Sequence, residues 1–217
     1  MADRDHQTRE KRAAAEAAAE LVRDGDKVGL GTGSTVAPML PALAARKLNI
    51  RCVATSIATE VAARALGIEV EPFEQLDRLD IAIDGADQID PEGWLVKGGG
   101  GAHTREKVVA AAAERFVVIA SSDKVVDRIV APIPLELLAF GLPATLRLLE
   151  SAELRHVPLS PDGGAIADYF GEVPDPASVA ARLSATPGVV DHGLFGPELV
   201  SDVLIAHGSE IEHRTIG

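Results

Sequence analysis

Three loops gather the residues whose types and spacing could perform chemistry, and the densest of them spans residues 97–107. Four consecutive glycines cost chain entropy, so a loop that keeps them is typical of a backbone that a ligand approaches closely. Lys97 brings a positive charge to this loop. Glu106 falls in the first turn of the helix expected next, where partial burial would suit a general base. The alternative is a surface helix capped by Thr104 and Lys107, with Glu106 solvated. His103 could shuttle protons, although a loop histidine is more often solvated.

A second loop carries two carboxylates, Asp84 and Asp87, which flank Gly85 and Ala86 after a short apolar run. Carboxylates three residues apart across a glycine turn can face one cavity. Close carboxylates push their pKa values apart, so that one can hold a proton near neutral pH. That property suits the relay of a proton between two oxygens. A helix cap with a solvated aspartate is the alternative.

The third loop, residues 29–35, follows a buried strand and precedes a helix. Its hydroxyls, on Thr32, Ser34 and Thr35, would join free N–H groups at the helix start in a neutral phosphate cradle. A P-loop is excluded because no lysine lies in this stretch. A dinucleotide fingerprint fails because Val36 or Ser34 would occupy its last glycine or alanine position. An ordinary tight strand–helix turn remains the alternative.

Other chemistry has weaker support in the sequence. Lys124 follows an apolar strand and could bind a phosphate or hydroxyl, with a plain surface lysine as the alternative. No metal site is expected, since the six histidines are scattered without an H-x-x-x-H pair or a cysteine partner. There is no G-x-S-x-G elbow. Cys52 is the single cysteine, which excludes an intramolecular disulfide and predicts a buried strand thiol.

Alternating helices and strands must position these loops. Strands are expected at 27–30, 51–55, 68–71, 81–83 and 116–120, and helices at 10–23, 36–45, 57–66 and 104–113. Strands buried on both faces and separated by helices predict an α/β fold with a doubly wound, mostly parallel, Rossmann-like sheet. Ligands then bind beyond the carboxyl ends of the strands.

The pattern changes near residue 130, where two prolines bracket a short strand. A helix at 143–151, a strand at 165–169, a helix at 177–185 and a strand at 189–194 follow. They predict a second, smaller α+β domain. The apolar stretch 203–206 is expected to rejoin the first sheet. We therefore expect a catalytic domain of residues 1–129 and 203–217, and a small domain of residues 130–202.

Charge and hydropathy restrict the partners. With 33 acidic against 21 basic residues the net charge is -12, which argues against a nucleic-acid partner. A phosphorylated ligand would then need local positive charge or backbone N–H groups. No apolar run reaches the ~18 residues of a membrane helix, and the charged N-terminus lacks a signal-peptide core. A cytoplasmic location without a membrane partner is expected.

Three motifs occur in a fixed order: Gly-x-Gly-Thr-Gly-Ser-Thr at 29–35, Asp-Gly-Ala-Asp at 84–87, and Lys-Gly-Gly-Gly-x-x-x-Thr-Arg-Glu-Lys at 97–107. Together they resemble the ribose 5-phosphate isomerase A family, and the resemblance extends over nearly the whole chain, including residues 187–195. It implies interconversion of aldose and ketose pentose 5-phosphates without a cofactor. It also implies a homodimer or homotetramer. The expected binding partner is a small-molecule sugar phosphate.

The resemblance also implies residue roles. Glu106 matches the family's base, which would move a proton from C2 to C1 through a cis-enediolate. Lys97 would stabilise the oxyanion, and Asp84 or Asp87 would open the furanose ring and relay a proton between O1 and O2. Lys11 is similar to a phosphate-proximal lysine. The implied substrate-binding residues are Thr32, Gly33, Ser34, Thr35, Asp84, Gly85, Ala86, Asp87, Lys97, Gly98, Gly99, Gly100 and Lys124.

The chain departs from the family in two places. Gln88 stands where the family usually has glutamate, and the 162–176 segment is unusual. Both are expected to affect oligomer contacts more than chemistry. The competing interpretations are a sugar-phosphate sensor module, an amino-sugar-phosphate isomerase/deaminase and an acyl-CoA transferase. A sensor of this kind usually carries a helix-turn-helix, and the residues before the first strand are expected to be too few for one. A nicotinamide oxidoreductase is disfavoured by the failed fingerprint.

Overall fold

The computed structural model describes the backbone of residues 2–216 and the side chains of residues 5–216. The chain divides into two compact units. The first comprises residues up to Ala86, Arg105–Val125 and the chain from Pro197 on; the second comprises Asp87–Thr104 and Val126–Gly196. The division expected from the sequence stays a prediction of domains. It differs from these units in where it assigns residues 87–104, 126–129 and 197–202.

A six-stranded sheet forms the centre of the first unit. Its strands are β1 (Lys27–Leu30), β2 (Arg51–Ala54), β3 (Leu79–Gly85), β6 (Ala113–Ser121), β12 (Asp202–His207) and β13 (Glu210–Thr215). They lie in the order β13-β12-β6-β3-β1-β2, and every pair is parallel except β12 with β13. The predicted mostly parallel α/β fold is confirmed, as is the return of residues 203–206 to the first sheet.

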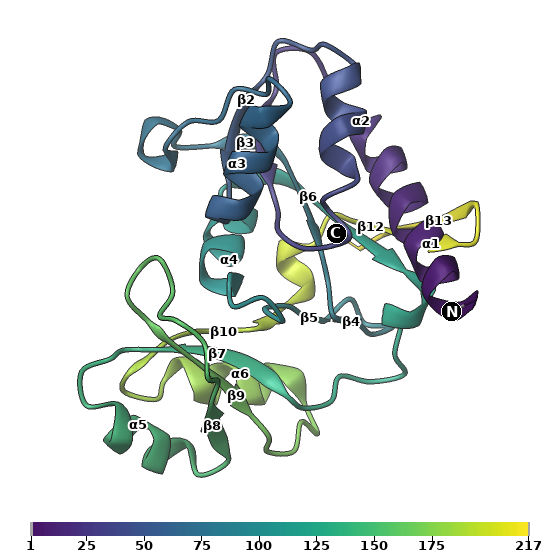
Figure 1. Ribbon diagram of the computed structural model, residues 1–217. Helices are drawn as coiled ribbons and strands as arrows, with labels where there is room; N and C mark the ends of the chain where they lie inside the picture. Colours follow the sequence, from purple (N-terminus) through teal and green to yellow (C-terminus); the bar gives the residue numbers. More distant parts are fainter. Residues whose placement is uncertain (1, 217) are drawn as a thin grey trace. The chain divides into compact units, whose positions relative to one another are not determined.

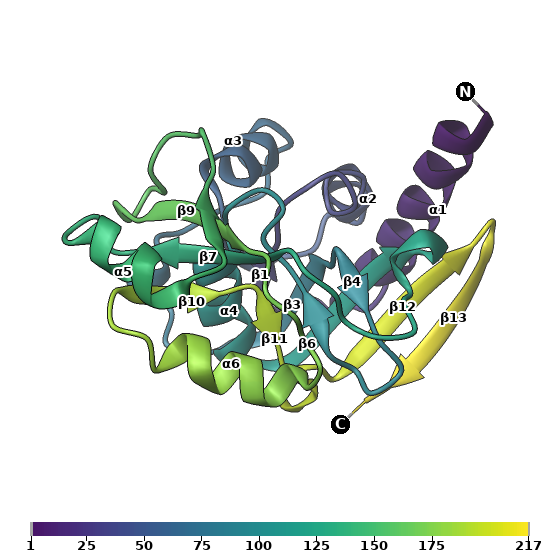
Figure 2. The same ribbon diagram turned by 90° about the horizontal axis from the view of Figure 1, so that it is seen from below.

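Helices cover both faces of this sheet: α1 (Ala2–Ala19), α2 (Met39–Ala45), α3 (Ile57–Ala65) and α4 (His103–Ala111). Val28 and Leu30 join the core cluster that contains α1 and α2. Gly29, which alternates with them, faces Val109 of α4. Figure 1 accordingly shows α1 and α2 on one side of the strands and α4 on the other. Figure 2 shows the yellow β12–β13 hairpin alongside α1.

Several predicted boundaries in the first unit are wrong. α1 ends at Ala19, before the predicted residue 23, because Leu21 and Val22 make tighter i→i+3 bonds to Ala18 and Ala19. α2 begins at Met39, after the predicted 36, and follows a series of turns. Pro38 and Pro41 lack the N–H groups that a regular helix through this stretch would use.

Two further differences concern strands. The stretch 68–71, predicted as a strand, makes a single isolated bridge between Val70 and Cys52. The polar hairpin strand β13 was not predicted. Short 3-10 turns also occur at Phe73–Gln75 (η1), Ser122–Lys124 (η2) and Pro197–Leu199 (η3).

The second unit contains the predicted α+β structure. Its elements run β7 (Ile133–Leu137), α5 (Leu142–Leu149), β8 (Ala152–Leu154), β9 (Ala165–Tyr169), α6 (Pro176–Ser184) and β10 (Val189–His192). The antiparallel sheet has the order β10-β7-β9-β8, a β-α-β-β-α-β arrangement in which β8 was not predicted. Apolar residues of β7 pack with α5 and α6 in one core. A small sheet joins β11 (Leu194–Phe195), β5 (Leu95–Val96) and β4 (Gln88–Ile89).

Candidate functional site

The loop after β1 is held by backbone and hydroxyl hydrogen bonds of the first unit. Gly31 N–H donates to Ile83 O over 2.9 Å, which ties the loop to the end of β3. The Thr32 hydroxyl lies 2.7 Å from the hydroxyl of Thr55 at the end of β2. Gly33 has a left-handed φ of 108°, and Ser34 beside it is exposed. The predicted cradle thus lies beyond the carboxyl ends of three parallel strands.

Lys11 brings a cation to this loop. Its Nζ donates to Ser34 Oγ over 2.9 Å from the middle of α1. A positive charge here offsets the overall net charge of -12 where an anion would bind. The structure therefore brings together Lys11 and the loop that the sequence assigned to phosphate.

Asp84 occupies the space beside the same loop. Its side chain is 3% exposed, and Oδ1 accepts N–H groups from Thr32 over 3.0 Å and Gly85 over 2.7 Å. A Cβ on Gly31 would lie 2.1 Å from that oxygen, so a glycine is required where the carboxylate approaches the backbone. Asp84 is consequently a fixed, buried carboxylate rather than a solvated helix cap.

Glu106 lies on the same side of the sheet as Asp84. Asp84 alternates with Ile81 and Ile83, which face the core under α1 and α2, so its side chain points to the α4 side. Glu106 is three residues before Val109, whose side chain packs at Gly29, and it is 6% exposed. The alternative of a solvated Glu106 on a surface helix is wrong.

The glycine-rich loop belongs to the second unit up to Thr104. Gly99 N–H donates to Asp87 Oδ2 over 2.9 Å, which places the exposed Asp87 carboxylate against the loop backbone. Lys97 is 3% exposed, with its Nζ 5.5 Å from the centre of the Phe195 ring and its N–H donating to Gly193 O over 2.8 Å. The structure thus joins Asp87 to the loop and buries Lys97 at its start.

His103 and Thr104 differ from their predicted roles. His103 is 0% exposed rather than solvated, and it begins α4. A Cβ on Gly98 would lie 2.6 Å from His103 Nδ1, so the imidazole packs directly under that glycine. Thr104 is the second residue of the helix, and its buried hydroxyl has no hydrogen-bond partner among the described residues. The predicted Thr104 cap is therefore wrong.

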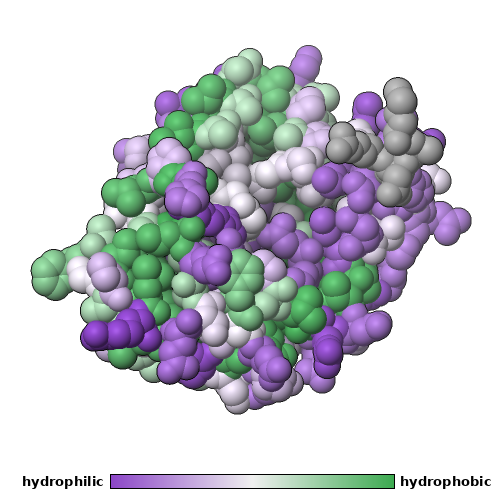
Figure 3. Space-filling view, turned by 60° about the horizontal axis from the view of Figure 1, so that its bottom comes forward, coloured by the Kyte–Doolittle hydropathy of each residue, from purple (hydrophilic) through white to green (hydrophobic). Residues whose placement is uncertain are grey.

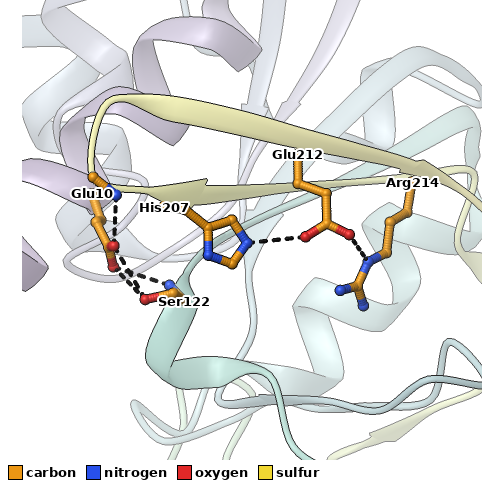
Figure 4. Close-up of polar contacts among 6 residues, drawn as sticks. Glu10, Ser122, His207, Glu212 and Arg214 are labelled. Atoms are coloured by element: carbon orange, nitrogen blue, oxygen red, sulfur yellow. Dashed lines mark hydrogen bonds and ion pairs between the residues drawn. The ribbon is translucent and has the colours of Figure 1, made fainter.

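Lys124 lies in η2, immediately after β6, with its Nζ 3.2 Å from Asp123 Oδ2. Glu10, which sequence reasoning missed, fixes the start of this turn (Figure 4). Its carboxylate accepts Ser122 N–H over 3.1 Å and Gly208 N–H over 2.8 Å, and it is 1% exposed. Burial raises the pKa of Glu10, but the hydrogen bonds from Gly208 and Ser122 outweigh it and hold that pKa below the ordinary value. Glu10 thus anchors the turn that carries Lys124.

Two expectations concern groups outside these loops. Cys52 is buried in β2, as predicted, and burial raises the pKa of its thiol to about 12. Among residues 5–216, no group of three or more His, Cys, Asp or Glu side chains is arranged to hold a metal ion. No helix within the described residues is long and apolar enough to span a membrane.

These features define an α/β protein suited to a phosphorylated ligand, with two buried carboxylates on one face of a parallel sheet. Comparisons with known proteins agree. The family model described as ribose 5-phosphate isomerase A (phosphoriboisomerase A) matches residues 51–210. The chain is 45% identical over 205 residues to ribose-5-phosphate isomerase A of Methylorubrum extorquens, a match that covers 85% of this chain and 87% of the relative.

Solved structures give the same result. Ribose 5 phosphate isomerase A from Neisseria gonorrhoeae has a TM-score of 0.92 and 30% identity, and the match covers 97% of this chain and 98% of the other. A D-ribose-5-phosphate isomerase in complex with phospho-erythronic acid has a TM-score of 0.89 and 30% identity, with 94% and 97% covered. The chain therefore belongs to the ribose 5-phosphate isomerase A family, whose members are aldose–ketose isomerases. They interconvert ribose 5-phosphate and ribulose 5-phosphate through an enediolate in the pentose phosphate pathway.

Proposed function

We propose that this chain carries out its family's isomerisation with Glu106 as the base that moves the carbon-bound proton. The observation that supports this most is the burial of Glu106 on the face of the sheet to which Asp84 also points. A carboxylate shielded from bulk water retains its basicity and can return the same proton before solvent exchanges it.

In this proposal the open-chain aldose loses its C2 proton to Glu106. Electrons from the C2–H bond form the C1=C2 double bond, and O1 becomes an oxyanion. The cis-enediolate then takes the proton back at C1, while one proton moves from O2 to O1. The Lys97 ammonium and loop N–H groups stabilise the oxyanion, and one preorganised donor of this kind contributes about 3–4 kcal/mol. The reaction needs no oxidant, because the carbon that is oxidised and the carbon that is reduced are neighbours.

Asp84 and Asp87 serve ring opening and the transfer between O1 and O2. The Asp84 carboxylate has a fixed orientation, because two backbone N–H groups donate to one of its oxygens. The exposed Asp87 is held through Gly99 alone among the described side chain–backbone bonds of that carboxylate. This bond holds Asp87 at the glycine-rich loop, where its carboxylate would pass a proton between two positions about 2.7 Å apart, the usual O–H···O distance.

Thr32, Gly33, Ser34 and Thr35 bind the phosphate in this proposal, together with Lys11, whose ammonium group donates to Ser34. Lys124, in the turn η2, adds a second positive charge for binding the substrate. Binding energy at the phosphate orients the reacting carbons at the other end of the substrate. Phospho-erythronic acid, found in one solved relative, combines a phosphate with a carboxylate, which is planar and negatively charged like the O1–C1=C2–O2 group of an enediolate. It is therefore a useful inhibitor to test here.

The test is Glu106→Gln in a coupled assay with ribose 5-phosphate. We expect kcat to fall by on the order of 10²–10⁴-fold, as for loss of a general base. Glu92→Gln, the same change at an exposed turn residue, is the control and should leave kcat unchanged. A Glu106→Gln enzyme within about threefold of wild type would remove Glu106 from this role. Turnover in heavy water should place some deuterium at the carbon that receives the proton.

One observation favours a second candidate. The family model described as DeoR C terminal sensor domain matches residues 6–72. A module that only binds sugar phosphates would bind ribose 5-phosphate in calorimetry without turning it over. Because residues 6–72 contain the Thr32–Thr35 loop but neither Asp84 nor Glu106, the match extends to the phosphate site alone.

We also propose that the chain forms a homodimer or homotetramer. The second unit exposes several large apolar side chains, with Phe140 87% exposed and Leu138 and Val190 each 50% exposed. Figure 3 shows such apolar surface on one face of the molecule. Exposed apolar surface of this kind is typical of association sites. A monomer by light scattering at assay concentration would contradict the proposal. The cytoplasmic location and the absence of nucleic-acid partners stay predictions.

A further inference from the structure

Arg155, just after β8, makes an unusually complete set of hydrogen bonds within the second unit. Its Nε and Nη2 donate to the two carboxylate oxygens of Asp168 on β9, over 2.7 and 2.6 Å. Its Nη1 donates to Gly98 O and Gly99 O, each over 2.9 Å. A bidentate pair fixes the plane of the guanidinium, so the remaining donor is aimed at the glycine-rich loop.

The same loop holds Asp87. Gly99 donates its N–H to Asp87 Oδ2 and gives its carbonyl to Arg155. A Cβ at Gly99 would lie 3.1 Å from both Asp87 oxygens, so the carboxylate fits closely against this glycine. One residue therefore connects the Arg155–Asp168 pair to a carboxylate of the proposed site, and a shift of its peptide would move that carboxylate.

The loop needs such support because glycine backbone is otherwise free to change conformation. Gly98 has a left-handed φ of 103° and its carbonyl is one of the two that Arg155 binds. Arg155 and Asp168 are each about one-fifth exposed or less, at 20% and 17%. Hydrogen bonding to Asp168 raises the pKa of Arg155, against the effect of its burial, and attraction to Asp168 and Asp87 adds to the rise. The cation is thus permanently charged.

We propose that Arg155, oriented by Asp168, is a positioning residue that holds the 98–99 backbone and thereby orients the Asp87 carboxylate for proton transfer. This inference rests on the proposed function. It assigns the unusual 162–176 segment a part in catalysis, through Asp168, in addition to any oligomer contact. Arg155 itself does not contact the reacting atoms.

Arg155→Lys is the decisive variant. Lysine keeps the charge but cannot bind Asp168 through two nitrogens and still reach two carbonyls. We expect kcat to fall by about 10–100-fold, the scale for a displacement of a catalytic group by ~1 Å. KM should change by less than about threefold, because the phosphate loop is not involved. Arg147→Lys, at an exposed arginine of α5, is the matched control and should behave as wild type.

A double-mutant cycle separates positioning of Asp87 from a general structural role. In an Asp87→Asn background, Arg155→Lys should lower kcat by less than about threefold, since the group that it orients is already disabled. Equal losses in both backgrounds would overturn the inference. So would an Arg155→Lys enzyme with unchanged kcat.

Hydrogen exchange of the 97–105 peptide gives a readout that does not need turnover. Arg155→Lys and Asp168→Asn should speed exchange of the Gly99 amide, whereas Arg147→Lys should not. Unchanged exchange would overturn the inference. Faster exchange in a protein whose wild type shows no isomerisation would instead contradict the proposed function and leave the loop anchor standing.

Discussion

Gly31→Ala tests whether Asp84 occupies the position that the structure gives it. The added Cβ would lie 2.1 Å from Asp84 Oδ1, 2.2 Å from Cγ and 2.6 Å from Cβ, and no flexible chain end separates them. Because ordinary contact begins near 3.4 Å, the carboxylate would have to move by about 1 Å or more. The N–H groups of Thr32 and Gly85 would then lose the oxygen that they share.

The size of the effect follows from these contacts. Overpacking costs about 1–3 kcal/mol, and a partly buried N–H left without its acceptor costs about 1–3 kcal/mol more. We expect the free energy of unfolding to fall by about 3 kcal/mol and Tm by about 6–12 °C for a chain of this size. If Asp84 acts in proton relay, its displacement should also lower kcat by about 100-fold.

Urea unfolding and the coupled assay measure these effects, and two further variants act as controls. Gly33→Ala strains a left-handed backbone without meeting a described heavy atom within 4 Å, so it should cost about 1–2 kcal/mol. In an Asp84→Gly background the colliding atoms are absent, and Gly31→Ala should cost less than about 1 kcal/mol. Strictly additive losses for Gly31→Ala and Asp84→Gly would refute the reasoning.

Three other predictions each concern the surroundings of one side chain. Cys52, with a pKa of about 12 because of burial, should not react with a thiol reagent at pH 8 until denaturant is added. Glu10→Gln should cost about 1.5–3 kcal/mol at pH 7 by urea unfolding. Because the native pKa of Glu10 lies below its ordinary 4.5, this contribution is complete above that value and is lost as pH falls through the native pKa, so the variant and wild type should converge in acid. Gln88 donates to Val130 O over 2.8 Å and accepts Val130 N–H over 2.9 Å, so Gln88→Glu should lose about 1–2 kcal/mol at neutral pH, and equal unfolding midpoints would contradict that assignment.

Periodicity and turn chemistry predict the strands that build the core, because apolar side chains decide their burial. Residues 165–169 form a strand with the predicted bounds, and residues 27–30 do the same. Two strands at sheet edges, β8 and β13, were missed. β13 contains Glu210, Glu212 and Arg214 and has no fully buried residue. Its pairing with β12 and the ion pair of Arg214 with Glu212 stabilise it instead, and neither is visible as an apolar pattern.

The candidate site likewise contains residues that the sequence predicts and residues that it does not. The glycine- and carboxylate-rich loops can be recognised in the sequence by their composition. Two of their carboxylates, Asp84 and Glu106, are buried in the structure. The residues that anchor those loops cannot be recognised from the sequence, because their partners are remote in it. Glu10 binds groups 112 and 198 residues away, and Arg155 binds carbonyls 56 and 57 residues away. A glutamate in an Ala/Glu-rich helix and a lone arginine give no local signal of such contacts.

The glycine-rich loop illustrates why composition alone overstates the role of a ligand. A side chain at Gly98 would meet His103, and one at Gly99 would meet Asp87, so the protein's own side chains already exclude larger residues at both positions. Gly100 has neither a left-handed φ nor a described heavy atom within 4 Å of a Cβ. Internal packing therefore accounts for Gly98 and Gly99 but not for Gly100, whose contact with the substrate stays a prediction. His103, Asp87 and Arg155 hold the loop by packing and hydrogen bonds, and such preorganisation is what a binding or catalytic loop requires.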